Sequence, residues 1–148
     1  MLKLDQADFT IGRAKFADNA PWAAEATAKI YVKVTPEPAT LDNVVFFALL
    51  DTGAAWSMLD AEIAENLNLL NRDGEPKTVK TWHGDIRGRL ERVSLRLHAD
   101  EGDSLDFEAT FLISPDWRFG TFLGYGGLLQ HIRFAIDATH NDFYFGKE

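Results

Sequence analysis

Short stretches of alternating apolar and polar residues, separated by turn residues, recur along the chain and constrain its fold more than any other feature. In one stretch Val93, Leu95 and Leu97 alternate with Ser94 and Arg96, as in a strand with one buried and one solvated face. A series of such strands is typical of an all-β sandwich or barrel rather than of βαβ units. The predicted strands cover residues 9–16, 27–34, 44–51, 77–83, 87–98, 105–113, 132–137 and 142–145.

Helical signals are confined to two places. Asp60 is expected to cap a helix that ends near residues 68–71, because aspartate accepts hydrogen bonds from the first free N–H groups of a helix. The apolar face of this helix is expected to consist of Ile63, Ala64 and Leu67. A second, short helix is expected over residues 126–131.

Length and charge narrow the class of protein. The 148 residues are expected to form a single domain over residues 1–148. The net charge of −8, from 15 basic and 23 acidic residues, argues against nucleic-acid and membrane-surface binding. The chain has no cysteine, which excludes a thiol nucleophile and suits a reducing compartment. Without an apolar core of signal-peptide length near the start, we expect a cytoplasmic protein and no membrane partner.

One stretch carries most of the chemical information. The apolar run 44–50 reads as a strand buried on both faces, and it leads directly into Asp51, Thr52 and Gly53. A carboxylate at the end of a buried strand is costly unless it is used. The Thr52 hydroxyl can bond nearby backbone, and Gly53 permits a tight turn or the close approach of another backbone.

The segment Asp51-Thr52-Gly53-Ala54 resembles the active-site signature of the retropepsin-like aspartic proteases. A second signature of that family, two apolar residues followed by glycine, is matched by Phe122-Leu123-Gly124. The short helix and strand expected after it follow the family's order, so the resemblance covers residues 44–136. It implies a retropepsin-like closed β-barrel of antiparallel strands with one or two short helices.

Between the two signatures lies a predicted hairpin, residues 81–88, with turn glycines between two alternating strands. It occupies the place of the family's flap, which closes over substrate, and we expect residues 77–93 to form a mobile flap. The resemblance then implies substrate binding by Ala54, Trp82, His83 and Gly84. The alternative for Trp82 and His83 is an ordinary surface hairpin with an exposed aromatic side chain.

The resemblance implies an aspartic endopeptidase that works as a homodimer on peptide or protein substrates. One chain supplies one catalytic aspartate, Asp51, whereas the mechanism needs two carboxylates that share a proton around one water molecule. Thr52 would brace the two loops across the two-fold axis, and Gly53 would leave room for peptide. No cofactor or metal is implied, and the four scattered histidines lack the spacing of metal ligands.

Two departures from the family pattern keep other functions open. Many dimeric members carry a polar or acidic residue after Asp-Thr-Gly-Ala and an arginine after the downstream glycine, where this chain has Ala55 and Tyr125. A non-proteolytic module that binds peptide or protein is therefore the main alternative. A monomeric scaffold in which Asp51 is structural is a third possibility. The tryptophans are expected to line the core or a groove: Trp22, Trp56, Trp82 and Trp117.

Overall fold

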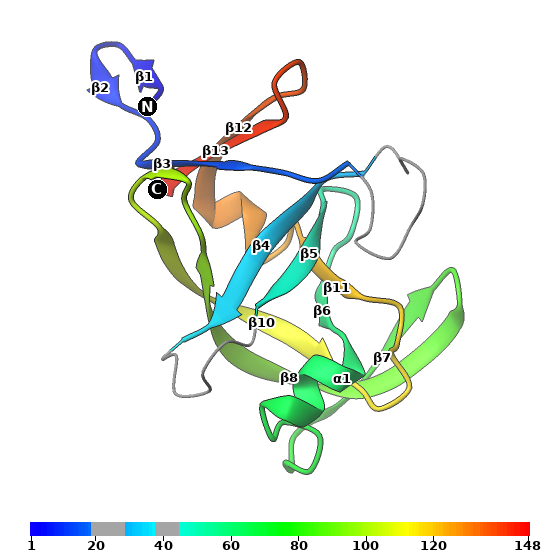
Figure 1. Cartoon of the computed structure of the whole chain (residues 1–148). Coiled ribbons are helices and arrows are strands. Elements are labelled where there is room, and N and C mark those ends of the chain that lie inside the picture. Colours follow the sequence, from blue (N-terminus) through cyan, green and yellow to red (C-terminus); the bar gives the residue numbers. More distant parts are fainter. Residues whose placement is uncertain (19–28, 38–44) are drawn as a thin grey trace.

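The computed structural model describes residues 1–18, 29–37 and 45–148, and strands dominate this part of the chain (Figure 1). In chain order the elements are β1 (Lys3–Leu4), β2 (Ala7–Asp8), β3 (Gly12–Lys15), β4 (Tyr31–Pro36), β5 (Phe46–Asp51), β6 (Ser57–Leu59), α1 (Ala61–Asn66), β7 (Pro76–Thr81), β8 (Gly84–Leu97), β9 (Glu101–Gly102), β10 (Leu105–Ile113), β11 (Thr121–Gly124), the 3-10 helix η1 (Leu129–His131), β12 (Ile132–Asp137) and β13 (Asp142–Lys147).

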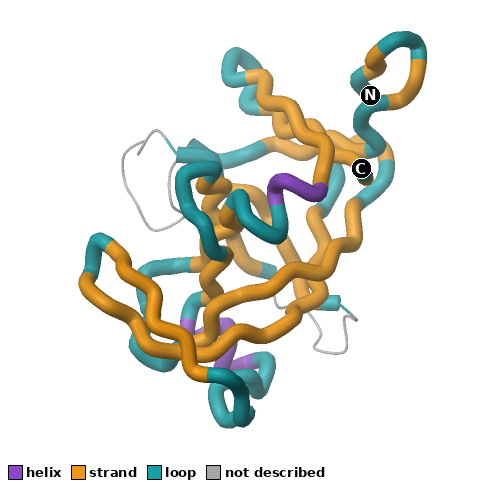
Figure 2. The backbone as a smooth tube through the Cα atoms, turned by 180° about the vertical axis from the view of Figure 1, so that it is seen from behind, coloured by secondary structure: helices purple, strands orange, loops and turns teal. Residues whose placement is uncertain are grey.

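The main sheet closes on itself. Its strands follow the order β10-β6-β11-β5-β4-β8-β7, and β8 also pairs with β10, so the sheet forms a ring from which β7 extends (Figure 2). Strand β8 both closes the ring and carries β7, because its 14 residues pair with β7 at one end and with β10 and β4 at the other. The predicted all-β class is therefore confirmed.

The alternating residues of β8 supply one wall of the core. Val93, Leu95 and Leu97 are buried, as the sequence pattern predicts. They pack with the buried side chains of the other strands in the ring, which include Val32, Val34, Ala48, Leu59, Ala109, Phe111 and Leu123. Burial of each large apolar side chain contributes roughly 1.5–3 kcal/mol to folding.

The expectation of purely antiparallel strands is wrong at two pairs. Strand β11 runs parallel to β5, and β10 runs parallel to β6. Parallel partners need a long connection that returns the chain to the same end of the sheet. The chain provides it through α1 and the β7–β8–β10 segment.

A second sheet joins the two ends of the described chain, in the order β12-β13-β3-β9. Strand β13 lies between β12 and β3, and its first residue, Asp142, is buried. The Asp142 carboxylate pairs with Lys15 at 2.7 Å and with Arg13 at 3.1 Å. These ion pairs tie β13 to the N-terminal strand.

The strand predictions at 105–113 and 132–137 match β10 and β12 in both bounds. The prediction at 9–16 is confirmed only for β3, and residues 82–83 form a turn rather than the end of a strand. Residues 27, 28 and 44 of two predicted strands, and Trp22, lie outside the described residues. Five short strands were not predicted from the sequence: β1, β2, β6, β9 and β11.

The prediction that β5 is buried on both faces is wrong for its first half. Phe47 is 36% exposed and Val45, just before the strand, is 49% exposed. Ala48 and Leu49 are buried. The inner face of β5 meets the core, whereas Phe47 lies on the outer face and lines a shallow hollow.

Asp60 caps α1 as predicted, with its Oδ1 accepting a hydrogen bond from the Glu62 N–H at 2.9 Å. Ala64 is buried, while Ile63 and Leu67 pack against the core from partly buried positions. The helix expected over residues 126–131 is present only as the short η1. In the described residues, no helix has the length and apolar character needed to span a membrane.

Candidate active site

Two segments far apart in the sequence meet at Asp51. Strand β5 ends at Asp51, and the parallel strand β11 beside it ends at Gly124, which is in register with Asp51. Both signature segments therefore lie at the same end of the sheet. Parallel pairing of these two strands places the downstream Phe122-Leu123-Gly124 beside the aspartate.

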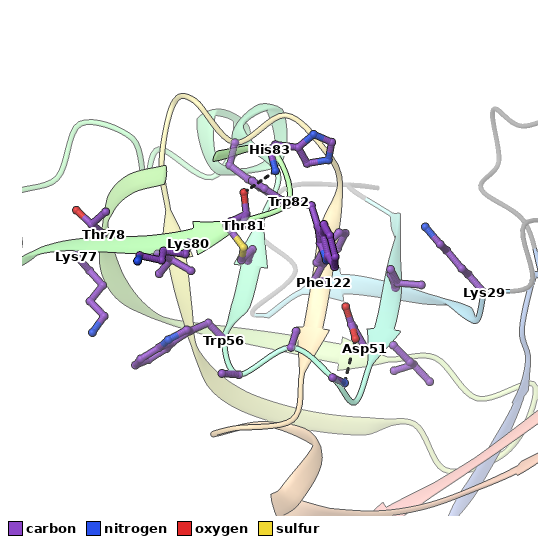
Figure 3. Close-up of a pocket in the computed structure, with 18 of the residues that line it drawn as sticks. Lys29, Asp51, Trp56, Lys77, Thr78, Lys80, Thr81, Trp82, His83 and Phe122 are labelled. Atoms are coloured by element: carbon purple, nitrogen blue, oxygen red, sulfur yellow. Dashed lines mark hydrogen bonds between the residues drawn. The ribbon is translucent and has the colours of Figure 1, made fainter. Parts of the chain in front are cut away.

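The loop after β5 holds the Asp51 side chain in a defined place. Its Oδ1 accepts a hydrogen bond from the Gly53 N–H at 3.0 Å, and its carbonyl oxygen accepts one from the Ala54 N–H at 3.1 Å. The Asp51 side chain is half-buried and points toward the space below the β7–β8 hairpin (Figure 3). Such a carboxylate reaches both backbone donors and solvent, as an acid–base group must.

The downstream segment packs against this loop through backbone contacts. The Gly124 N–H donates to Oγ of the buried Ser57 at 3.0 Å, and the Tyr125 N–H donates to the Ala54 carbonyl at 2.8 Å. A Cβ on Gly124 would lie 2.5 Å from the Trp56 carbonyl oxygen. Only glycine fits this close approach of two backbones.

A groove of about 1000 Å³ runs past Asp51 (Figure 3). Its apolar lining comes from the end of β5, from β6, from β11 and from the loop before β11: Leu49, Leu50, Met58, Trp117 and Phe122. One side of the groove is formed by residues 77–83 of the hairpin. An apolar groove with a few polar groups is the usual form of a binding site.

The β7–β8 hairpin, expected to be the flap, turns at Trp82 and His83. The Thr81 Oγ1 accepts from the His83 N–H at 3.1 Å and donates to the Gly84 carbonyl at 2.7 Å. Gly84 has a φ of +98°, which favours glycine at this corner. The Trp82 side chain is fully exposed, at 103% of its reference area.

The tip of the hairpin contacts the loop that precedes β11. The His83 ring stacks on Phe119 with centroids 3.6 Å apart and planes 3° apart. This loop is fixed in turn by α1, because the Gly120 N–H donates to Asp60 Oδ2 at 3.0 Å. The helix cap and the hairpin tip therefore hold the same loop from two sides.

Five of the seven site residues predicted from the sequence line the groove: Asp51, Gly53, Ala54, Trp82 and His83. Thr52 and Gly84 are not among the lining residues of this single chain, and both are exposed. Gly53 does not have a positive φ, and a Cβ there would lie an ordinary 3.4 Å from Asp51 Oδ1. A local turn therefore does not require glycine at this position.

Several groove residues were not singled out from the sequence. The sequence indicates Phe122 only as part of the downstream signature, and it indicates no role for Lys29 or Lys77. Trp56 and Trp117 line the groove, which agrees with the expectation for the tryptophans, and Trp117 is also 2% exposed. Lys77 and Phe122 lie on strands, and Lys29, Trp56 and Trp117 lie on loops, and a local sequence pattern does not indicate which hollow any of these side chains faces.

The two positions that depart from the family pattern are both at the surface. Ala55 is exposed and Tyr125 is 49% exposed. A Cβ on Gly126 would lie 2.5 Å from the Ala55 carbonyl oxygen. Backbone packing and the Tyr125–Ala54 hydrogen bond thus join the two loops where the family pattern has side-chain charges.

The geometry agrees with what comparisons with known proteins show. Residues 37–103 match the model of a family described as aspartyl protease, and this range contains Asp51 and the β7–β8 hairpin. A solved structure, that of a retropepsin-like aspartic protease from Rickettsia conorii, superposes with a TM-score of 0.58 at 19% identity. The match covers 91% of this chain and 98% of that one. The fold is that of the retropepsin-like aspartic proteases.

The resemblance inferred from the two signatures is therefore confirmed. None of the curated proteins compared with this retropepsin-like chain matches it significantly in sequence. Within the described ranges, no three His, Asp or Glu side chains gather as a group that could hold a metal ion.

Proposed function

We propose that the protein is an aspartic endopeptidase that acts as a homodimer and hydrolyses peptide bonds with water activated by paired Asp51 carboxylates. The observation that carries this proposal is the position of Asp51, which is half-buried, lies next to the downstream signature segment and borders a groove that a hairpin covers on one side. The aspartyl protease family match and the retropepsin-like fold support peptidase activity.

In the proposed reaction, one Asp51 is ionised and takes a proton from water, whose oxygen attacks the carbonyl carbon of the peptide. The other Asp51 is protonated and donates to the carbonyl oxygen. Collapse of the tetrahedral intermediate then breaks the C–N bond: the Asp51 that took the proton from water delivers it to the leaving nitrogen, and the other Asp51 takes back a proton from a hydroxyl group of the intermediate, which restores the pair with one proton. Two carboxylates this close cannot both ionise readily, because each negative charge disfavours the other, so the pair retains one proton for this step.

The surface around Asp51 supports a second copy at this place. Thr52, Gly53 and Ala55 are exposed in the single chain, directly beside the half-buried carboxylate. A two-fold axis through this loop brings the two Asp51 side chains together and covers the exposed residues. Thr52 then braces the loops across the axis, and the close approach of the partner or peptide accounts for the glycine at position 53.

A non-proteolytic module that binds peptide is the second candidate. It is favoured by Ala55 and Tyr125, which stand where many dimeric members of the family carry a polar or acidic residue and an arginine. Such a module keeps the groove and the hairpin but does not use the acid–base chemistry of Asp51.

Light scattering and one substitution test the proposal. A homodimer of the 16.6 kDa chain should scatter as about 33 kDa at micromolar concentration. Asp51→Asn should abolish peptide cleavage and weaken the binding of a pepstatin-type inhibitor. The fold should persist, because asparagine keeps the shape of aspartate but not its titratable group. Asp103→Asn, which removes an exposed carboxylate from another surface, serves as the matched control.

A strict monomer with full peptidase activity would refute the shared dyad. If Asp51→Asn melts earlier yet cleaves normally, Asp51 is structural. If peptide binds but neither protein cleaves it, the binding module is the correct function.

A further inference from the structure

The charge of the groove is opposite to the charge of the whole chain. The net charge is −8, yet the described lining includes three lysines, Lys29, Lys77 and Lys80, and Asp51 is its only acidic residue. A cleft lined by one sign of charge concentrates ligands of the opposite sign. Because Asp51 belongs to the proposed chemistry, the lysines set the charge that a bound ligand meets elsewhere along the groove.

The ammonium group of Lys77 keeps a charge that a ligand in the groove can meet. Its cross-strand partner in the β7–β8 pairing is Gly88, which has no side chain. The Lys77 Nζ lies 5.1 Å from the centroid of the Trp56 ring, within cation–π range. The ring therefore holds the ammonium group beside the groove without neutralising its charge.

Lys29 lies on the other side of Asp51 from Lys77 and Trp56 (Figure 3). It precedes β4 and lines both the main groove and the adjoining hollow. Neither Lys29 nor Lys77 forms an ion pair within the part of the chain that the structure describes. Lys80 forms no ion pair in this part of the chain either, but unlike Lys77 it has an acidic residue, Asp85, as its direct cross-strand partner.

Apolar side chains gather around Asp51 in the groove. Leu49, Leu50 and Phe122 line the groove around Asp51. The order along the groove is thus a positive charge, an apolar region with the carboxylate, and a second positive charge. An extended peptide matches this order when apolar residues are flanked on both sides by acidic ones.

We propose that the groove selects extended peptides with apolar residues at the scissile bond and aspartate or glutamate on each side, bound through Lys29 and Lys77. This inference rests on the proposed peptidase function and adds the substrate class. Exposed ion pairs are weak and screened by salt, so each lysine is expected to change affinity about twofold to fivefold.

Binding and cleavage are measured on three peptides that share a central Leu-Phe pair and are flanked by glutamate, glutamine or lysine. Binding uses the Asp51→Asn full chain, in which the peptides stay intact, and cleavage uses the wild type. We expect the glutamate peptide to bind most tightly and to be cleaved with the highest kcat/KM. The preference should shrink as ionic strength rises above the physiological range.

The lysines are then changed one at a time. Lys77→Gln and Lys29→Gln should each reduce the preference for glutamate over glutamine, and Lys77→Arg should restore it because arginine keeps the charge and the ring contact. Lys33→Gln is the matched control, since Lys33 is exposed on β4 and outside the groove lining. Melting temperatures establish that each variant is folded.

The outcomes separate the two proposals. Cleavage without charge preference would overturn the acidic-substrate inference and leave the peptidase function in place. Preferential binding of the glutamate peptide without cleavage by wild type would keep the charge inference and overturn the peptidase function. An equal loss of preference in Lys33→Gln would also overturn the assignment to Lys29 and Lys77.

Discussion

Gly124 lies beside Asp51 in the parallel pairing of β11 with β5, and its missing side chain lets the two loops pack backbone against backbone. The Gly124 N–H is fixed by Ser57, and the next residue, Tyr125, bonds to Ala54. The loop that carries the aspartate is therefore supported by a segment that is distant in the sequence but adjacent in the sheet. Substitutions in that support are expected to disturb the site without touching a ligand.

Gly124→Ala should destabilise the protein by about 1–3 kcal/mol, because its Cβ would overlap with the Trp56 carbonyl oxygen and the backbone must move. Gly53→Ala is the matched control, since a Cβ there meets nothing closer than 3.4 Å. At concentrations low enough to keep the chain monomeric, the control should melt at or slightly above the wild-type temperature; at higher concentrations its added Cβ should weaken the proposed dimer and reduce peptide cleavage. Thermal unfolding of both variants checks this, and equal melting of Gly124→Ala and wild type would contradict it.

Ser57→Ala should cost about 1–3 kcal/mol, because it leaves the Gly124 N–H without a partner inside the protein. Ser104→Ala removes the same kind of bond, from the Ala99 N–H, at an exposed position where water can replace it. We expect a loss within about 0.5 kcal/mol for that control. Urea unfolding compares the two, and similar losses would show that burial of the bond is unimportant.

Asp142 should stabilise the fold only above acidic pH. A hydrogen bond from Lys15, together with the charge of Arg13, lowers the pKa of Asp142 in the folded protein. Because the pKa is lowered on folding, the stabilisation is fully present at pH values above the pKa of this carboxyl group in the unfolded chain, which is about 4. It is lost as the pH falls through the pKa of Asp142 in the folded protein. Asp142→Asn should therefore melt earlier than wild type at neutral pH, and the difference should shrink below about pH 4. Asp103→Asn, which removes an exposed carboxylate outside this cluster, is the matched control, and an equal pH dependence in both variants would contradict the role of Asp142.

The hairpin tip should open when its contact with the loop before β11 is removed. Phe119→Ala deletes the ring on which His83 stacks, so backbone amides of residues 82–85 should exchange with solvent faster than in wild type. Ile136→Ala, which shortens an exposed side chain on β12, is the control. Hydrogen exchange followed by mass spectrometry measures both. Unchanged exchange in Phe119→Ala would show that the stack does not hold the tip.

The pH profile of kcat/KM for peptide cleavage should be bell-shaped, with its maximum on the acidic side of neutrality. Two carboxylates that share one site titrate as a pair, and the proposed reaction needs one proton between them. Activity should fall when both protons are present and when both are lost. The profile of kcat/KM on a fluorogenic peptide tests this, and activity that rises steadily into the alkaline range would indicate different chemistry.

The sequence was sufficient to predict the strands whose patterns are local. Strands β8 and β10 alternate strongly, and Asp60 is followed by an apolar face, so both strands and the α1 cap were predicted. Strand β6 has only three residues, Ser57–Leu59, and all are buried by neighbours distant in the sequence. Its pairing with β10 and β11 has no local signal.

Within the site, motif and pattern predicted the Asp51 segment and the hairpin beside the groove, but not which other side chains line that groove. Lys77 lies on β7 and Lys29 lies just before β4, and only the closed sheet brings these two segments to one hollow. The exposure of Phe47 could not be predicted either, because an apolar run does not indicate which of its side chains other segments cover. Such features depend on tertiary pairing rather than on local preference.

The position of β13 between β12 and β3 has a consequence for the order of folding. The β7–β8 and β12–β13 hairpins join neighbouring segments and can form early, whereas β3 pairs with β13 only when residues 12–15 reach residues 142–145. Closing so long a loop is entropically costly and slows folding. We therefore expect the strands of the ring to pair first and β3 to pair with β13 last. A refolding intermediate should then contain the folded groove region while β3 and β13 are still unpaired with each other.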